Sequence, residues 1–364
     1  MASMQEVLAQ CTNVLPGHGR SDSAKEAFQR LADALQGDET LDHYGSGDYI
    51  AAFEAEVAEM LGKEAGLFMP SGTMAQQIAL RIWCDRRQNP TVVMHPTAHP
   101  EGAEHQAYRF LHGLQRLQFS APEFVGSRLL TTKDLETLAH EPGVVLLELP
   151  HRPLGGQLSP WEDLLATRAW ADERGIPLHL DGARLWQCRP FYGHDDYRPI
   201  ADLFDSIYVS FYKALGGLAG AMLVGPASFI EQARVWRIRH GGRLFTLAPY
   251  VISAKLGLER VLPQIDGWVA KARAVAAALD EFEPISVKPN PPHVNMFQLY
   301  VRGDAEALNQ RHLELAEETG TFLFWGLGPS PVPGVAMTEI HCWENAAQFA
   351  LEPLRPFVER LLEL

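Results

Sequence analysis

One lysine stands alone in an otherwise uncharged stretch. Lys213 lies in SIYVSFYKALGGLAGAMLVG, between a strand-like run and a Gly-rich turn that leads into another strand. Burial among apolar and small residues disfavours an ammonium ion, so this amine could lose its proton and condense with an aldehyde. Gly216, Gly217 and Gly220 would let a bulky planar group approach the backbone. Taken alone, the pattern also fits a strand-end lysine whose charged head reaches solvent.

A carboxylate and an arginine follow a second apolar run. Asp181 ends IPLHLD, and Arg184 lies three residues further on in HLDGARLW. Open α/β sheets bind ligands at the carboxyl ends of their strands, where a buried carboxylate needs a cation. A protonated pyridine nitrogen would supply one, and the ring could then draw electrons from a substrate's α-carbon. Arg184 could bind the ring's phenolic oxygen or a substrate carboxylate; an ordinary surface ion pair gives the same pattern.

Hydroxyl residues stand at the start of an expected helix. The segment GLFMPSGTMAQQIAL predicts a strand, a loop containing Ser71, Gly72 and Thr73, and a helix with apolar periodicity. Helix N-termini bind anions through free amides and the helix dipole, so this loop is a candidate phosphate site. A simple helix cap made by Ser71 or Thr73 would look the same. The order of loop, Asp181 and Lys213, each at a strand-to-loop junction, favours a pyridoxal phosphate (PLP) site.

These segments resemble the low-specificity threonine aldolases and their β-eliminating-lyase relatives. The family patterns are approximately SGTxAN, HxDGARLxN and SxxKxLGxxxGxxLxG, and the similarity is clearest from about residue 20 to residue 248. The resemblance implies a PLP-dependent enzyme of fold type I, the aspartate-aminotransferase type. Lys213 would form the Schiff base, and Asp181 would pair with the pyridine nitrogen. The phosphate-binding residues that it implies are Ser71, Gly72, Thr73, Ser210 and Arg243, the last near the phosphate or a subunit boundary.

The resemblance also implies roles for two histidines and a serine. His99, in AHPEGAEHQAYRFLHG, matches a family histidine that lies flat on the cofactor ring; His95 and His105 are alternatives close in sequence, and a structural role is a further one. His151, in ELPHRPLGG, falls where the family has Glu-Asn-Thr-His and would take a proton from the substrate's β-hydroxyl. Ser21 of RSDS, similar to the family's RSDT, would bind the substrate carboxylate together with Arg184.

The sequence departs from the family pattern in three places. Gln76 stands where the family usually has Asn, and Met337 stands where it has an arginine four residues before His341. The loop QCRPFYGHDDYRP after DGARLW also differs from the family. Because a bidentate arginine orients a carboxylate and strengthens its binding, its absence would weaken amino-acid recognition or shift it to Arg184 or another basic residue.

The elements that must position these residues alternate between two types. Short apolar runs such as VVLLEL and SIYVSFY are separated by helical segments such as LSPWEDLLATRAWADERG, which predicts an α/β fold with a mainly parallel sheet covered on both faces. After about residue 262 come a long Ala-rich helix, a Pro-rich link and the strand candidate VNMFQLYV. We therefore expect an N-terminal arm with a helix (1–45), a large PLP-binding domain (46–262) and a smaller α+β C-terminal domain (263–364).

Composition limits the partners. A formal charge of −14, from 31 basic and 45 acidic residues, argues against nucleic-acid binding. No stretch approaches the roughly 20 apolar residues that a membrane span requires, and we expect no membrane partner. The four cysteines lie far apart without a CxxC pair, which disfavours a metal site or a disulfide framework and suits a reducing compartment, so a cytoplasmic location is expected.

The preferred function is that of a PLP-dependent lyase acting on a small amino acid. It would cleave a β-hydroxy-α-amino acid such as threonine to glycine and an aldehyde. The alternative within this chemistry is β-elimination or another lyase reaction on a different β-substituted amino acid. A non-catalytic PLP-binding protein, and an α/β enzyme of another kind in which DGAR is accidental, are the other hypotheses. The resemblance further implies a homodimer or homotetramer.

Overall fold

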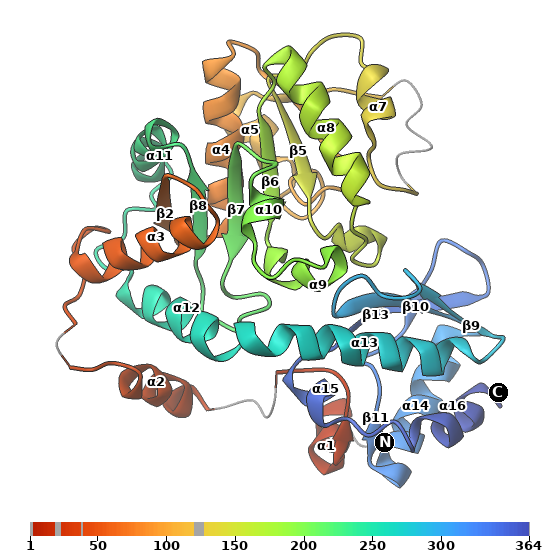
Figure 1. The fold of residues 1–364 in the computed structure, drawn as a ribbon. Helices are drawn as coiled ribbons and strands as arrows, with labels where there is room; N and C mark the ends of the chain where they lie inside the picture. Colours follow the sequence, from red (N-terminus) through yellow and green to blue (C-terminus); the bar gives the residue numbers. More distant parts are fainter. Residues whose placement is uncertain (1–2, 19–22, 38, 120–126, 364) are drawn as a thin grey trace. The chain divides into compact units, whose positions relative to one another are not determined.

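The chain forms two compact units in the computed structural model, which describes residues 3–18, 23–37, 39–119 and 127–363 (Figure 1). The large unit comprises Asp22–Pro153 and Leu158–Pro263. The small unit comprises Met1–Ser21, Leu154–Gln157 and Gln264–Leu364. Each unit has a hydrophobic core of its own.

The large unit is built on a seven-stranded sheet in the order β2-β8-β7-β6-β5-β3-β4. Its strands are β2 (Ala65–Met69), β3 (Thr91–Val93), β4 (Gln115–Arg116), β5 (Val144–Glu148), β6 (Leu178–Gly182), β7 (Ser206–Ser210) and β8 (Ala221–Gly225). All neighbouring strands are parallel except β8, which runs antiparallel to both β2 and β7. Every residue of β6, β7 and β8 is buried, as expected for strands covered on both faces. The predicted α/β fold with a mainly parallel sheet is confirmed.

Helices lie on both faces of this sheet. The helices of the unit are α2 (Ala24–Asp33), α3 (Asp48–Met60), α4 (Gly72–Arg86), α5 (Ala107–His112), α7 (Thr132–Glu136), α8 (Trp161–Arg174), α9 (Arg189–Tyr192), α10 (Arg198–Ala201), α11 (Ala227–Arg239) and α12 (Ala248–Arg260). Neighbouring side chains of β2 point to opposite faces of the sheet, and each face is covered by different helices. Phe68 contacts Phe53 of α3 on one face. On the other face, Leu67 belongs to a core with Ile78 of α4 and Phe229 of α11.

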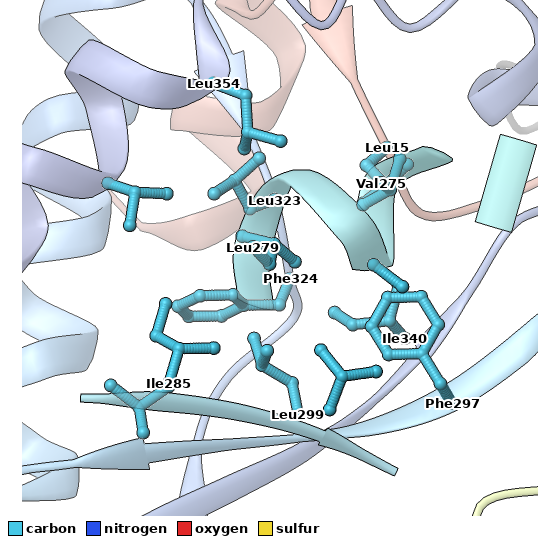
Figure 2. Packing of buried hydrophobic residues seen from close by; sticks show 14 of the residues in the cluster. Leu15, Val275, Leu279, Ile285, Phe297, Leu299, Leu323, Phe324, Ile340 and Leu354 are labelled. Carbon is cyan, nitrogen blue, oxygen red and sulfur yellow. The ribbon is translucent and has the colours of Figure 1, made fainter. Parts of the chain in front are cut away.

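The small unit contains a four-stranded antiparallel sheet in the order β12-β13-β10-β9 and a two-stranded parallel pair, β1-β11. Its strands are β1 (Asn13–Val14), β9 (Ile285–Lys288), β10 (Met296–Arg302), β11 (Thr321–Phe322), β12 (Gly328–Pro329) and β13 (Val335–His341). Its helices are α1 (Met4–Gln10), α13 (Ile265–Asp280), α14 (Ala305–Thr319), α15 (Glu344–Gln348) and α16 (Leu354–Leu362). Figure 2 shows Leu279 of α13 in one core with Leu299 and Ile340 of the sheet. The Ala-rich segment is thus a helix that packs on an α+β core.

Three further observations bear on partners and ligands. Within the described ranges, no helix combines the length and the apolar character needed to cross a membrane. No cluster of three or more His, Cys, Asp or Glu side chains in that part of the chain is arranged to hold a metal ion. All four cysteines are free thiols, and Cys84, Cys188 and Cys342 are buried.

Candidate active site

Charged side chains converge where three neighbouring strands end. Glu148 is the last residue of β5 and lies directly opposite Asp181 of β6 in the strand register. Asp181 in turn lies opposite Tyr208 of β7, and the chain continues from β7 to Lys213. The carboxyl ends of parallel strands meet at one edge of a sheet, where α/β proteins bind ligands. The expected Lys213 and Asp181 therefore lie at the same edge.

The surroundings of Lys213 favour a neutral amine. Burial lowers the pKa of Lys213, and the positive charge of Arg184 lowers it further. The negative charges of Asp181 and Glu148 act in the opposite direction, but the net direction is downward. A lowered pKa increases the fraction of free amine, which is the form that condenses with an aldehyde. The structure thus brings Lys213, Asp181 and Arg184 within electrostatic reach of one another.

Asp181 is a buried carboxylate at the sheet edge. Its exposed fraction is 1%, and its Oδ1 accepts a hydrogen bond from the Ala183 amide at 3.1 Å. A buried carboxylate requires a cation or several donors to offset its desolvation. A protonated pyridine nitrogen is a cation of the required kind.

The N-terminus of α4 packs directly on strand β7. Ser71 caps the helix, because its Oγ accepts a hydrogen bond from the Met74 amide at 3.3 Å. A Cβ atom on Gly72 would lie 1.9 Å from the Tyr208 hydroxyl, so only glycine fits there. Thr73 follows in the first turn and is exposed. Since Tyr208 lies opposite Asp181, this helix end, the candidate phosphate site, reaches the same sheet edge.

The other three expected ligands differ in their placement. Ser210 ends β7, and its buried hydroxyl interacts with that of Tyr208, the side chain that packs against Gly72 at the start of α4. Arg243 is exposed and its guanidinium lies 5.0 Å from the centre of the Tyr44 ring. The preceding Gly242 lies against Met74 in the first turn of α4, which brings this loop beside the candidate phosphate site. Ser21 lies outside the described residues.

A chain of hydrogen bonds holds the imidazole of His99. Its Nδ1 lies 2.9 Å from Glu104 Oε1, and Glu104 Oε2 accepts a hydrogen bond from Gln77 Nε2 at 2.6 Å. Burial raises the pKa of the Glu104 carboxyl. Of the two alternatives in the sequence, His95 is buried in other contacts and His105 is exposed. The His99 amide donates to Glu148 Oε2 at 3.3 Å, so His99 lies beside the charged edge.

His151 is a buried, neutral imidazole near the same edge. Burial lowers its pKa to about 3, and the neighbouring His95 contributes in the same direction. The two imidazole rings are 4.2 Å apart, and His151 Nε2 lies 2.9 Å from Thr97 Oγ. Its Nδ1 lies 3.6 Å from Glu148 Oε2. A neutral imidazole has a lone pair that can accept a proton, but a group with a pKa of about 3 must pass that proton on to a stronger base.

Glu148 is a candidate functional residue that the sequence analysis did not single out. Burial raises its pKa to about 7, and the charge of Asp181 opposite it raises the pKa in the same direction. Its Oε1 accepts a hydrogen bond from the Arg152 amide at 3.2 Å. A carboxyl group that titrates near neutrality in a site is a candidate for proton transfer. One signal in the sequence could have identified it: like Asp181, Glu148 ends an apolar strand.

Gln76, one of the departures from the family pattern, belongs to a buried network. Its Oε1 accepts a hydrogen bond from His179 Nε2 at 2.8 Å. His179 Nδ1 lies 2.8 Å from Ser206 Oγ, which also accepts from Trp83 Nε1 at 2.7 Å. The network ties α4 to β6 and β7, two residues before Asp181. Gln76 thus helps to hold the strand that carries the carboxylate.

These features fit an aromatic aldehyde that carries a phosphate. The lysine amine has a lowered pKa, the carboxylate is buried, and a helix N-terminus meets the same strands. Together with the mainly parallel sheet, they define a PLP-dependent enzyme of fold type I.

Comparisons with known proteins identify the family. The beta-eliminating lyase family matches residues 20–303, and the chain belongs to this family. Low-specificity L-threonine aldolase 1 of Arabidopsis thaliana is 28% identical over 320 residues, which cover 84% of this chain and 87% of that protein. A solved structure from Listeria monocytogenes, provisionally named an L-allo-threonine aldolase, has 35% identity and a TM-score of 0.90 and covers 99% of both chains. One from Exiguobacterium, provisionally named an aromatic amino acid beta-eliminating lyase/threonine aldolase, has the same identity and TM-score over 98% of both.

The comparisons confirm four of the predictions. These are the resemblance to the threonine aldolase and β-eliminating lyase family, fold type I, the enzymatic nature of the protein and PLP as its cofactor. The coarser function, a PLP-dependent lyase, is confirmed with them.

Proposed function

We propose that the enzyme cleaves the Cα–Cβ bond of a small β-hydroxy-α-amino acid, such as threonine, to give glycine and an aldehyde. The observation that carries this proposal is the buried His151, whose Nδ1 lies 3.6 Å from Glu148 Oε2, at the sheet edge that also carries Asp181 and Lys213. Retro-aldol cleavage requires removal of the hydroxyl proton, and these groups can accept one. The names of the relatives, which include several low-specificity L-threonine aldolases, support the same activity.

Each side chain has a separate task. PLP supplies the electron sink for the bond that breaks. Lys213 would bind the cofactor aldehyde, Asp181 would keep a proton on the pyridine nitrogen, and His99, oriented by Glu104, would lie against the ring. The residues proposed to bind the phosphate are Ser71, Gly72, Thr73, Ser210 and Arg243.

The substrate carboxylate requires a cation, and Arg184 is our proposal for it. Arg184 is near enough to Lys213 to lower the pKa of the lysine, so its positive charge lies within the site. Met337 of β13, opposite Tyr300 of β10, has a thioether where the family has a guanidinium. Ser21 would be a second ligand of the carboxylate, and His151 would receive the hydroxyl proton.

β-Elimination is a second candidate, which Met337 favours because the carboxylate contact of standard aldolases is altered. A product assay separates the two reactions. The holoenzyme should be incubated with threonine, allo-threonine, serine and β-chloroalanine. Glycine and an aldehyde, in equal amounts, are expected from the hydroxy amino acids. Ammonia and a keto acid without glycine would contradict aldol cleavage and indicate β-elimination.

We also propose a homo-oligomer, a dimer or a tetramer, that acts in the cytoplasm. Supporting the oligomer, exposed apolar side chains surround Arg243: Tyr44 is 46% and Phe245 is 61% exposed, and their rings are in contact. Free thiols suit a reducing compartment. Light scattering should give the mass of at least two chains; an active monomer would refute the oligomer.

A further inference from the structure

A chain of hydrogen bonds beside the site determines where two imidazoles carry their protons. His95 Nε2 lies 3.0 Å from the carbonyl oxygen of Arg128. A carbonyl only accepts hydrogen bonds, so His95 must carry hydrogen on Nε2. The backbone amide of Thr97 donates to His95 Nδ1 at 3.1 Å, which requires a lone pair on that atom. His95 is therefore the neutral Nε2–H tautomer.

The same reasoning passes through the Thr97 hydroxyl to His151. Thr97 Oγ lies 2.8 Å from His95 Nδ1 and 2.9 Å from His151 Nε2. Since His95 Nδ1 has no hydrogen, the single hydroxyl hydrogen of Thr97 must lie between these two atoms, and it shares the Nδ1 lone pair with the Thr97 amide. The Thr97 oxygen must then accept a hydrogen bond from His151 Nε2. His151 is consequently also the Nε2–H tautomer, and its basic lone pair is on Nδ1.

That lone pair faces a carboxyl group. His151 Nδ1 lies 3.6 Å from Glu148 Oε2. The backbone amides of His99 and Arg152 also donate hydrogen bonds to this carboxyl. A cavity of about 20 Å³ is lined by His95, Glu148, His151 and Ser159, among others, and has room for one water molecule. A proton can therefore pass between Glu148 and His151 after a small movement of the two side chains, or through one bridging water molecule.

We propose that Glu148 and His151 form the proton-exchanging pair of this site, with one proton moving between Glu148 Oε2 and His151 Nδ1. His95 and Thr97 are positioning residues, because they fix the tautomer of His151. The proton exchange is a step of the proposed aldol reaction and rests on that proposed function. The tautomer of His151 follows from the hydrogen bonds alone.

The proton balance of a retro-aldol reaction requires such a pair. The hydroxyl proton leaves as the Cα–Cβ bond breaks and the aldehyde forms, and the bonding electrons stay with Cα. One proton then returns to Cα to give glycine, so the reaction neither consumes nor releases protons overall. The enzyme must hold one proton between these events, and Glu148 and His151 can hold it between them.

The charges around Glu148 determine where this proton rests. Burial and the charge of Asp181 raise the pKa of Glu148 to about 7, while burial lowers that of His151 to about 3. The ionisable groups that act on Glu148 are Asp181, His99, His151, Arg184 and Lys213, and the group that acts on its partner His151 is His95. Glu148 therefore begins the cycle as a carboxylate, and the proton taken from the substrate is held on Glu148, which leaves His151 Nδ1 bare again.

Nitrogen NMR of the holoenzyme, labelled in its histidines, tests the tautomer directly. The expected result is Nε2–H for both His95 and His151. Thr97→Val should remove the fixed tautomer of His151, and Thr97→Ser should restore it. An Nδ1–H tautomer of His151 in the wild type, or an unchanged spectrum in Thr97→Val, would overturn the assignment.

Exchange of the α-protons of glycine into deuterated solvent tests the proton transfer without needing cleavage. In Glu148→Gln we expect a fall of about 100-fold in exchange and cleavage, loss of the pH dependence near neutrality and retention of the bound cofactor. The matched control is Glu136→Gln, at an exposed position of α7, which should behave as the wild type. Retained exchange with the same pH dependence in Glu148→Gln would refute the pair. A wild type that exchanges glycine protons but cleaves no hydroxy amino acid would instead refute the proposed function.

Discussion

Gly72 and Tyr208 lie so close together that no side chain fits between them. A Cβ atom on Gly72 would be 1.9 Å from the Tyr208 hydroxyl and 2.4 Å from the ring carbon that carries it. Gly72 is the first residue of α4, and Tyr208 lies opposite Asp181 in the sheet. The contact therefore fixes the distance between the helix N-terminus and the carboxylate, the two groups proposed to hold opposite ends of the cofactor.

Substitution of Gly72 by alanine should weaken cofactor binding. The added methyl group must displace α4 from β7, and overpacking of this kind typically costs about 1–3 kcal/mol. We expect the Kd for PLP to rise by about tenfold and the melting temperature to fall. Gly102→Ala is the matched control, because a Cβ there meets nothing within 4 Å. Equal PLP affinities of the Gly72 variant and the wild type would contradict this role.

Two substitutions should move the pKa of Lys213 in opposite directions. Arg184→Gln removes a positive charge that lowers this pKa, so the pKa should rise. Asp181→Asn removes a negative charge that raises it, so the pKa should fall. The pH dependence of covalent PLP attachment to the apoenzyme reports both shifts. Shifts of the same sign in the two variants would contradict the described arrangement of charges.

The stability of the protein should fall below neutral pH, in part because of His312. Burial lowers the pKa of this imidazole from 6.5 to about 3, and its Nε2 accepts a hydrogen bond from the Leu323 amide at 3.1 Å. The unfolded chain binds the proton first, so the stabilisation is complete above pH 6.5 and is lost as the pH falls toward 3. This one group should remove about 2 kcal/mol of unfolding free energy between pH 6.5 and pH 5.

Denaturant unfolding of the variants measures this contribution. His312→Gln keeps an acceptor for the Leu323 amide but does not titrate, so its loss of stability on acidification should be smaller than that of the wild type. His140→Gln, at an exposed position, should not change the pH dependence. The same acid sensitivity in the His312 variant and the wild type would show that another group is responsible.

The fold was largely predictable from local patterns. Apolar runs such as residues 144–149 and 206–212 became β5 and β7, and the helical segment 158–175 became α8. Buried parallel strands and amphipathic helices each leave a local signature, and a few residues suffice to read it. The expected lysine, aspartate and helix start then met at one sheet edge because parallel strands all end there.

The contacts that tune the site were not predictable from the sequence. Glu148 became a candidate only when the register placed it opposite Asp181, and that register depends on pairing of strands distant in sequence. The tautomer of His151 depends on Thr97, 54 positions away, and the need for glycine at position 72 depends on Tyr208. Such relationships are properties of tertiary packing and have no local signal.

The most direct test of the account is the site of covalent cofactor attachment. The holoenzyme should be reduced with borohydride, digested and analysed by mass spectrometry. The phosphopyridoxyl group is expected on Lys213 alone, and Lys213→Ala should fold, bind PLP without forming the imine and lose turnover. Lys255→Ala, on α12, is the matched control and should carry the group on Lys213 as the wild type does. A label on another residue, or no label on a folded and active enzyme, would contradict the account.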